Sequence, residues 1–185
     1  MKLSEHETSW LQSDGAMMMS ELGIKKGNSV IDFGSGQGRY TIPLSQCTGN
    51  NGRVFSFERD KDDIAILNER LPSFSQENNT RIFNVEDLNI KSHINGNAID
   101  VILAFDVLQY IEDWDRLFSS FHSVLKRKGS LHIYPAAIPH PGSVNMEIAI
   151  FILEKSGFEF LEIKEFRMMH NVDMVEDKVY SFRLN

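Results

Sequence analysis

A short apolar run that ends in three alternating glycines is the feature that most constrains this chain. Residues 29–33 read Ser-Val-Ile-Asp-Phe, and Gly34, Gly36 and Gly38 follow. Such a run favours a buried β-strand. Glycine lets the backbone turn sharply and approach a ligand closely, because it carries no Cβ. A helix is expected just beyond, and its first N–H groups would face the same loop. The pattern predicts a ligand-binding loop at the end of a strand.

Three classes of ligand compete for this loop. A P-loop requires Lys and then Ser or Thr after its last glycine, whereas Gly38 is followed by Arg39 and Tyr40. A dinucleotide loop requires a third glycine where Arg39 stands, and Asp32 would set a carboxylate near the pyrophosphate. A cofactor that carries a positive charge removes this repulsion. The loop therefore favours a cationic cofactor.

Apolar runs and amphipathic segments alternate along the chain. Strands are expected over residues 29–33, 53–58, 80–84, 99–105, 130–134 and 158–166, and from 175 or 178 to 184. Helices are expected over residues 40–46, from 60 to about 70, from 113 or 115 to about 125, and over 144–156. Pro72 should end the second helix, and Gly129 should follow the third as its C′ residue.

This order of elements predicts the fold. Strands separated by helices pair in parallel through right-handed crossovers, whereas the last two strands have only a loop between them and can form an antiparallel hairpin. We therefore expect an α/β, Rossmann-like, doubly wound sheet of seven strands. The sheet should be mostly parallel, with an antiparallel terminal strand and helices on both faces.

Composition narrows the partners. The 185 residues include 19 Lys and Arg against 26 Asp and Glu, a formal net charge of −7, which makes a nucleic-acid partner unlikely. No apolar run approaches the roughly 18–20 residues of a membrane span. Cys47 is the only cysteine, so an internal disulfide and a multi-cysteine metal site are ruled out. We expect a cytoplasmic protein without a metal, a monomer or homodimer, with one domain over residues 1–185 and a helical lid over residues 1–28.

The strand, acid and alternating glycines from Val30 to Gly38 resemble the first motif of the class I S-adenosylmethionine-dependent methyltransferases. Further landmarks follow in the family's order as far as the C-terminus, and residues 125–131 resemble the family's Leu-Lys-x-Gly-Gly-x-Leu before strand five. The chain is most similar to the small-molecule branch that includes the ubiquinone/menaquinone C-methyltransferases. The resemblance implies S-adenosylmethionine as cofactor, S-adenosylhomocysteine as product, and a small-molecule methyl acceptor.

The resemblance also implies which residues bind the cofactor. Glu58, which ends the second strand, should accept hydrogen bonds from both ribose hydroxyls. Asn84 and the backbone of Val85 should contact the adenine, with Asp87 as the rival of Asn84. The complete implied set is Asp32, Gly34, Ser35, Gly36, Gly38, Glu58, Arg59, Asn84, Val85 and Phe105.

The reaction implied is an in-line displacement at the methyl carbon, for which the protein chiefly supplies alignment and a dry site. A general base is needed only if the acceptor arrives protonated, and Asp106, Tyr110 and His140 are the weak candidates. The Asn/Asp-Pro-Pro-Tyr/Phe motif of amide methylation and the Pro-Cys motif of cytosine methylation are absent. A non-catalytic partner subunit and a protein or RNA methyltransferase remain the alternatives.

Overall fold

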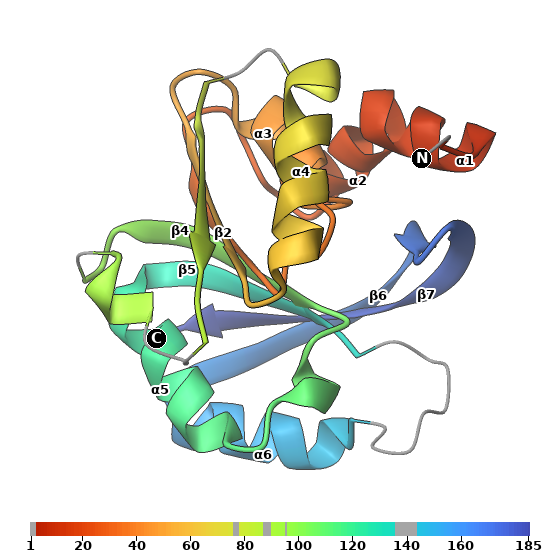
Figure 1. The fold of residues 1–185 in the computed structure, drawn as a ribbon. Helices are drawn as coiled ribbons and strands as arrows, with labels where there is room; N and C mark the ends of the chain where they lie inside the picture. Colours follow the sequence, from red (N-terminus) through yellow and green to blue (C-terminus); the bar gives the residue numbers. More distant parts are fainter. Residues whose placement is uncertain (1–2, 76–77, 87–89, 95, 136–143) are drawn as a thin grey trace.

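The computed structural model describes residues 3–75, 78–86, 90–94, 96–135 and 144–185. A seven-stranded sheet runs through the molecule in the order β3-β2-β1-β4-β5-β7-β6 (Figure 1). The strands are β1 (Ser29–Phe33), β2 (Arg53–Glu58), β3 (Thr80–Asn84), β4 (Ile99–Phe105), β5 (Leu125–Tyr134), β6 (Phe158–His170) and β7 (Asp173–Leu184). Strands β1 to β5 pair in parallel, and β7 runs antiparallel to both β5 and β6. The predicted sheet is confirmed.

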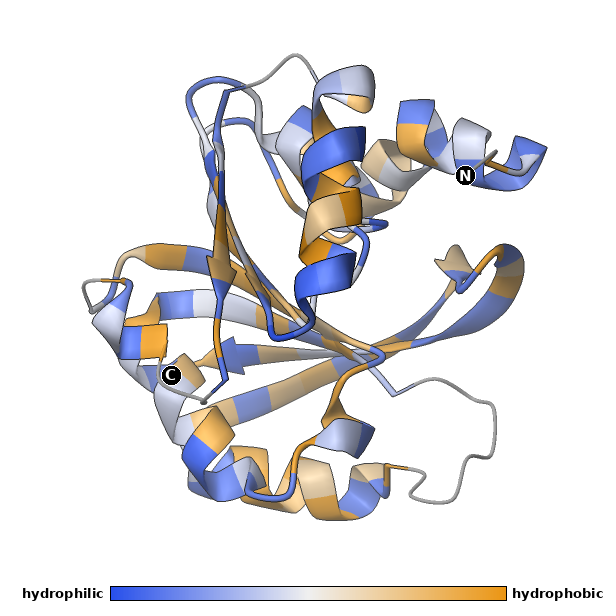
Figure 2. Cartoon of the chain, viewed as in Figure 1, coloured by the Kyte–Doolittle hydropathy of each residue, from blue (hydrophilic) through white to orange (hydrophobic). Residues whose placement is uncertain are grey.

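Helices cover both faces of this sheet. One face carries the N-terminal helices α1 (Glu5–Ser9), η1 (Trp10–Asp14) and α2 (Gly15–Glu21), with α3 (Thr41–Thr48) and α4 (Lys61–Phe74). The other face carries α5 (Trp114–Val124) and α6 (Met146–Lys155), and short 3₁₀ turns lie at Ile90–Ser92 and Leu108–Tyr110. Consequently the central strands are apolar on both sides and α4 alternates polar and apolar positions (Figure 2).

Successive residues of a central strand pack into two different cores. Val30 points into the cluster beneath α2, α3 and α4, whereas its neighbour Ile31 points into the cluster beneath α5 and α6. On β4, Leu103 and Ile102 divide in the same way. This division explains why the parallel strands are near-continuously apolar in sequence.

Helix α4 departs from the sequence expectation. We expected Pro72 to end it near residue 70, but the helix continues to Phe74 with Pro72 in its last turn. The N–H of Ser75 still donates to the Leu71 carbonyl at 2.9 Å, which closes that turn. Leu71 and Phe74 pack against the core, and this burial offsets the one hydrogen bond that proline removes.

The start of β5 also differs from the sequence expectation. Gly129 is not a helix C′ residue, because α5 ends at Val124 and β5 begins at once with Leu125. Lys128 takes a φ of +64°, and a Cβ on Gly129 would lie 3.0 Å from the Asp100 carbonyl. The ladder with β4 shifts register here, so the extra residues form an irregular strand start. Between β3 and β4, the described residues form one 3₁₀ turn and no α-helix.

The last two strands are longer than predicted. They extend to His170 and begin at Asp173, so the β6–β7 hairpin projects beyond the sheet and its tip curls toward the N-terminal helices (Figure 1). The extra length carries residues 167–173 to the carboxyl edge of the central strands. Side chains of this hairpin therefore reach the ligand-binding edge.

Candidate active site

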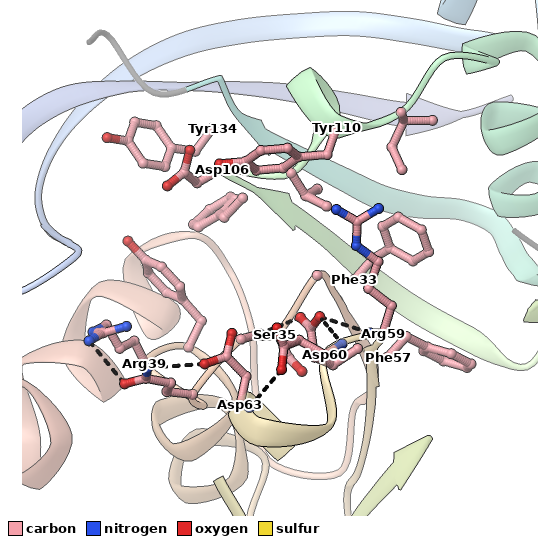
Figure 3. Close-up of a pocket in the computed structure, with 18 of the residues that line it drawn as sticks. Phe33, Ser35, Arg39, Phe57, Arg59, Asp60, Asp63, Asp106, Tyr110 and Tyr134 are labelled. Carbon is pink, nitrogen blue, oxygen red and sulfur yellow. Dashed lines mark hydrogen bonds between the residues drawn. The ribbon is translucent and has the colours of Figure 1, made fainter. Parts of the chain in front are cut away.

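A cavity of about 710 Å³ opens at the carboxyl ends of the central strands. The glycine loop after β1 and the residues after β2 line one side. The residues after β4, the end of β5 and the tip of the β6–β7 hairpin line the other side. Figure 3 shows Ser35 and Asp63 across the cavity from Asp106 and Tyr134. Open α/β sheets bind ligands at this edge, where crossovers leave β1 and β4 in opposite directions.

The loop after β1 requires glycine at two positions for different neighbours. Gly34 has a φ of +79° and Gly38 a φ of +85°, a region that L side chains rarely adopt. A Cβ on Gly34 would collide with Val107, and one on Gly38 would collide with Leu67. Gly34 lines the cavity, whereas Gly38 lies behind it against α4. The loop is therefore pressed between the segment after β4 and the helix after β2.

Glu58 ties β2 to the glycine loop. Its Oε2 accepts from the Gly36 N–H at 2.8 Å, and its Oε1 accepts from the N–H groups of Arg59 and Asp60 at 2.8 and 2.9 Å. Three backbone donors thus hold one carboxylate at the cavity wall. A carboxylate fixed in this way can also accept hydrogen bonds from a pair of ligand hydroxyl groups if one backbone N–H gives up its place.

Asp32 lies beneath the loop and does not line the cavity. The carboxylate is 2 % exposed, and the Thr41 hydroxyl donates to its Oδ2 at 2.6 Å. Burial raises the pKa of Asp32 to about 7, and nearby Glu58 adds to the rise, while the Thr41 hydrogen bond opposes it. Near neutral pH this carboxyl therefore gains or loses its charge in response to a neighbouring cation.

The residues expected at the adenine are placed differently from one another. Val85 lines the cavity with Phe57 and Arg59. Asn84 does not line it, because its Nδ2 donates to the carbonyls of Glu58 and Arg59 at 3.2 and 2.8 Å and so clamps β3 to the end of β2. Asp87, its rival, lies outside the described residues.

The segment after β4 carries the acceptor-side candidates. Phe105, Asp106 and Tyr110 all line the cavity, whereas His140 lies outside the described residues. Asp106 has a φ of +52°, unusual for a residue with a side chain. Its N–H donates to the Tyr134 carbonyl at 2.8 Å, and the Gln109 amide donates to its Oδ1 at 2.6 Å. These bonds hold its carboxylate at the cavity wall.

His170 lines the cavity but is absent from the residues predicted from the sequence. The expected strand ended at residue 166, but β6 continues and delivers a 6 % exposed imidazole to the cavity. Its Nδ1 lies 3.4 Å from Asp106 Oδ2 and 3.3 Å from the Tyr134 hydroxyl. The signal in the sequence was the apolar pair Met168-Met169, which continues the strand, followed by Asn171, which takes a φ of +54° at the turn.

The N-terminal helices rest on the residues that follow the glycine loop. The Trp10 indole N–H donates to the Arg39 carbonyl at 2.7 Å. The buried carboxylate of Glu7 lies 3.3 Å from Arg39 Nε and 3.1 Å from Arg70 Nη1. Arg39, which stands where a dinucleotide loop has glycine, is thus paired with the N-terminal segment at the edge of the cavity.

Sequence comparison identifies the family. A family profile described as "Methyltransferase domain" matches residues 24–147. A protein of Saccharolobus solfataricus named as a probable cobalt-precorrin-6B C(15)-methyltransferase (decarboxylating) is 30% identical over 150 residues, which cover 81% of this chain and 71% of that one. A namesake from Thermoplasma volcanium is 27% identical over 64 residues, or 35% of this chain and 32% of that one.

Solved structures share the fold. A SAM-dependent methyltransferase from Aquifex aeolicus superposes with a TM-score of 0.77 at 19% identity, covering 96% of this chain and 93% of that one. The [4+2]-cyclase SpnF superposes with a TM-score of 0.71 at 15% identity, covering 92% and 80%. The name of the second structure shows that this fold also supports chemistry other than methyl transfer.

The chain belongs to the methyltransferase-domain family, the class I S-adenosylmethionine-dependent methyltransferases, as its resemblance predicted. It is an S-adenosylmethionine-dependent methyltransferase, and the family's cofactor fits a glycine-lined loop beside a hydrogen-bonded carboxylate. Among the described residues, no helix is both long and apolar enough to cross a bilayer.

Proposed function

We propose that this enzyme methylates a small molecule, because its cavity has the volume of a small-ligand site. About 710 Å³ is the volume of a single small-ligand site, and cofactor and acceptor must share it. The tip of the β6–β7 hairpin lines this space, and the N-terminal helices, proposed as a lid over residues 1–28, contact one of its lining residues, Arg39. The alternatives, a folded protein substrate or an RNA substrate, have less room here, and the net charge of −7 disfavours RNA.

The proposed cofactor site follows the side of the cavity formed after β1 and β2. Ser35 and Gly36 would lie along the cofactor, and Glu58 would accept hydrogen bonds from its ribose hydroxyls. Val85 and Arg59 would border its adenine base. S-adenosylmethionine supplies, when bound, an activated methyl group on a sulfonium. The protein's own part is to hold the acceptor in line with that group and to keep water out, as Phe105 does at the cavity wall.

Asp32 and Asn84, outside the cavity lining, would act on the cofactor indirectly. Asp32 lies under the loop with a pKa near neutrality, so an adjacent cation would favour its ionised form. Asn84 would set the position of Glu58 and Arg59 through its hydrogen bonds to their carbonyls. Neither residue would touch the cofactor, and isosteric substitution of each residue can test its role.

A second candidate comes from the relative in Saccharolobus solfataricus, whose name states a decarboxylating C-methylation. That reaction would require an acceptor that carries a carboxylate. On the acceptor side, however, the cavity is lined by Asp106, Glu112 and Asp113. Because like charges repel in a partly enclosed site, we favour an uncharged acceptor over a carboxylated one.

The test begins with calorimetric titration of S-adenosylmethionine and S-adenosylhomocysteine into the full chain. Micromolar binding of both, about −8 kcal/mol, is the expected result, and absence of both would overturn the proposal. Transfer of radiolabel from methyl-labelled cofactor to a panel of acceptors follows. Release of carbon dioxide from a carboxylated acceptor would favour the second candidate.

We further propose a cytoplasmic monomer or homodimer. The lone cysteine, Cys47, is half-buried and free, which suits a reducing compartment. Sedimentation of the full chain at several concentrations distinguishes the two oligomeric states, and localisation of a tagged chain tests the compartment.

A further inference from the structure

Three polar groups from distant parts of the chain meet at the acceptor side of the cavity. Asp106 follows β4, Tyr134 ends β5, and His170 ends β6, so the group assembles only when the hairpin folds over the sheet edge. The Tyr40 hydroxyl donates to the carbonyl of Met169, and this bond fastens the hairpin tip beside the glycine loop. His170 and Asn171 both line the cavity.

We propose that His170 is the general base that removes a proton from the methyl acceptor, and that Asp106 is a positioning residue that orients its ring. The inference rests on the proposed function, since it names the proton chemistry of the same cavity. It also defines the acceptor as a neutral molecule with an acidic hydroxyl, of the phenol or enol type. Imidazole accepts protons near neutral pH, which is what such an acceptor requires.

The hydrogen bonds around His170 agree with one neutral tautomer. A carboxylate only accepts, so the 3.4 Å approach of Asp106 Oδ2 calls for the proton on Nδ1, and the Tyr134 hydroxyl, 3.3 Å from the same nitrogen, then accepts from it. The Asn171 amide nitrogen only donates, and it lies 3.1 Å from Nε2, which therefore carries the lone pair. Asn171 is exposed at the turn, so an acceptor hydroxyl can replace its amide. The free lone pair on Nε2 is the one that a base needs.

Two tyrosines beside the hairpin tip, Tyr134 and Tyr40, are unsuited to the role of base. Burial, and after it Asp177 and Asp106, raise the pKa of Tyr134 beyond its usual range. Burial also raises the pKa of Tyr40, with further contributions from Tyr134, Asp32 and Asp106. Both phenols therefore stay protonated and serve as hydrogen-bond donors.

The backbone of Asp106 is held in an unfavourable conformation at this point. A φ of +52° is a backbone conformation that non-glycine residues rarely adopt, because it is strained. The conformation persists because the Tyr134 carbonyl, the Gln109 amide and the His170 ring all bond to the residue. Strain maintained by three partners is typical of a residue whose direction matters for function.

The proton balance of the step is complete without a further reactant. The acceptor O–H bond breaks and its proton moves to His170 Nε2, while the oxygen forms the new bond to the methyl carbon. The electron pair of the broken bond between carbon and sulfur stays on sulfur, which loses its positive charge. His170 is left as an imidazolium stabilised by Asp106, and it returns the proton to solvent.

The first experiment needs no acceptor. Long-range ¹H–¹⁵N spectra of the full chain bound to S-adenosylhomocysteine at pH 8 report which ring nitrogen of each histidine carries the proton, and His170→Gln identifies the signals. We expect the proton on Nδ1 of His170 and its transfer to Nε2 in Asp106→Asn, because the new amide donates to Nδ1. A proton on Nε2 in the unaltered chain would overturn the inference.

The second experiment measures turnover with methyl-labelled cofactor and a panel of simple phenols and thiols. We expect His170→Gln to lower kcat for a phenol by about 10²- to 10⁴-fold with S-adenosylhomocysteine affinity kept within about twofold. At pH 9 an aromatic thiol, already ionised, should be methylated at a rate that does not depend on His170. His122→Gln, at an exposed histidine of α5 outside the cavity lining, is the matched control.

The outcomes separate the two proposals. If the chain binds neither S-adenosylmethionine nor S-adenosylhomocysteine, the proposed function fails. If it binds them but His170→Gln methylates phenols at the unaltered rate, only the assignment of the base fails.

Discussion

The two sides of the cavity are built in different ways. The cofactor side consists of a loop and two strand ends that lie close together in sequence. Backbone N–H groups that donate to the Glu58 carboxylate hold it, together with glycines at positive φ. The acceptor side joins Asp106, Tyr134 and His170 through side chains, across as many as 64 residues of chain. The cofactor side therefore depends on Glu58 and on the absence of a side chain at Gly34, whereas the acceptor side depends on three side chains that only folding brings together. One fold can therefore keep its cofactor while its acceptor varies.

The largest effect should come from Gly34→Ala, which tests whether the cofactor side depends on backbone shape. The alanine must adopt a φ of +79°, and its Cβ would collide with Val107. We therefore expect a loss of about 2–5 kcal/mol in the free energy of unfolding. Binding of S-adenosylhomocysteine should fall below detection. Denaturant unfolding and calorimetry measure the two effects.

Gly27→Ala is the matched control for this substitution. Gly27 has a φ of +88°, but no atom lies within 4 Å of the position that an added methyl group would take, so it isolates backbone strain from collision. We expect a loss of only about 1–2 kcal/mol and unchanged binding. Equal losses at both positions would contradict the role of Val107.

Glu58→Gln should weaken cofactor binding without affecting the acceptor side. The neutral amide loses charge-assisted bonds, so we expect a cost of about 1–3 kcal/mol, roughly 5- to 150-fold in Kd. Glu112→Gln, on the opposite side of the cavity, should leave the affinity within about twofold. If both variants bind alike, the division of the cavity into two sides is wrong.

Asp32 predicts a pH dependence of binding. In the free protein its pKa is about 7, and a bound cation lowers it, so binding releases a proton below that pH. Affinity for S-adenosylmethionine should rise by as much as about tenfold per pH unit up to pH 7 and then level off. Calorimetry across pH 5.5–8.5 measures this rise, and Asp32→Asn should abolish it.

The raised pKa of Asp32 also predicts a pH dependence of folding stability, and this dependence has the opposite sign: stability falls as pH rises. Because the pKa in the folded state lies above the ordinary value of 3.8, the folded state holds more protons between the two values. The contribution of Asp32 is complete below about pH 4 and is lost as pH rises to about 7. Asp32→Asn should remove that fall, and a denaturant series over this range that shows no difference would contradict the assignment.

The smallest effect should come from Tyr40→Phe, which tests the link between the two sides. The ring keeps its edge contacts with Trp10 and Phe105, but the bond from its hydroxyl to the Met169 carbonyl is lost. We expect about 1 kcal/mol of destabilisation, faster amide exchange at residues 168–172, and cofactor affinity within about threefold. Unchanged exchange at the hairpin tip would show that another contact holds it.

Much of the cofactor side could be read from the sequence. The strands at residues 29–33, 53–58, 80–84 and 99–105 have the predicted bounds, and Gly34, Gly36 and Glu58 line the cavity, although Gly38 does not. This was predictable because buried parallel strands have a continuous apolar pattern and glycine favours the sharp turn that follows the first strand. Asn84 shows the limit, since its pairing with two carbonyls of β2 depends on the register of β3, which local pattern does not contain.

Only the tertiary structure brought His170 to the cavity. Its position depends on how far β6 and β7 continue to pair, on the turn at Asn171, and on the bond from Tyr40 to Met169. None of these leaves a periodic signal, because residues 161–165 of β6 are all exposed and residues 168–170 are all buried, so the burial does not alternate along the strand. The sequence by itself determined the sheet, the glycine loop and the family. The long-range packing of the hairpin decided which side chain meets the acceptor, because contacts between distant residues depend on three-dimensional register rather than on local pattern.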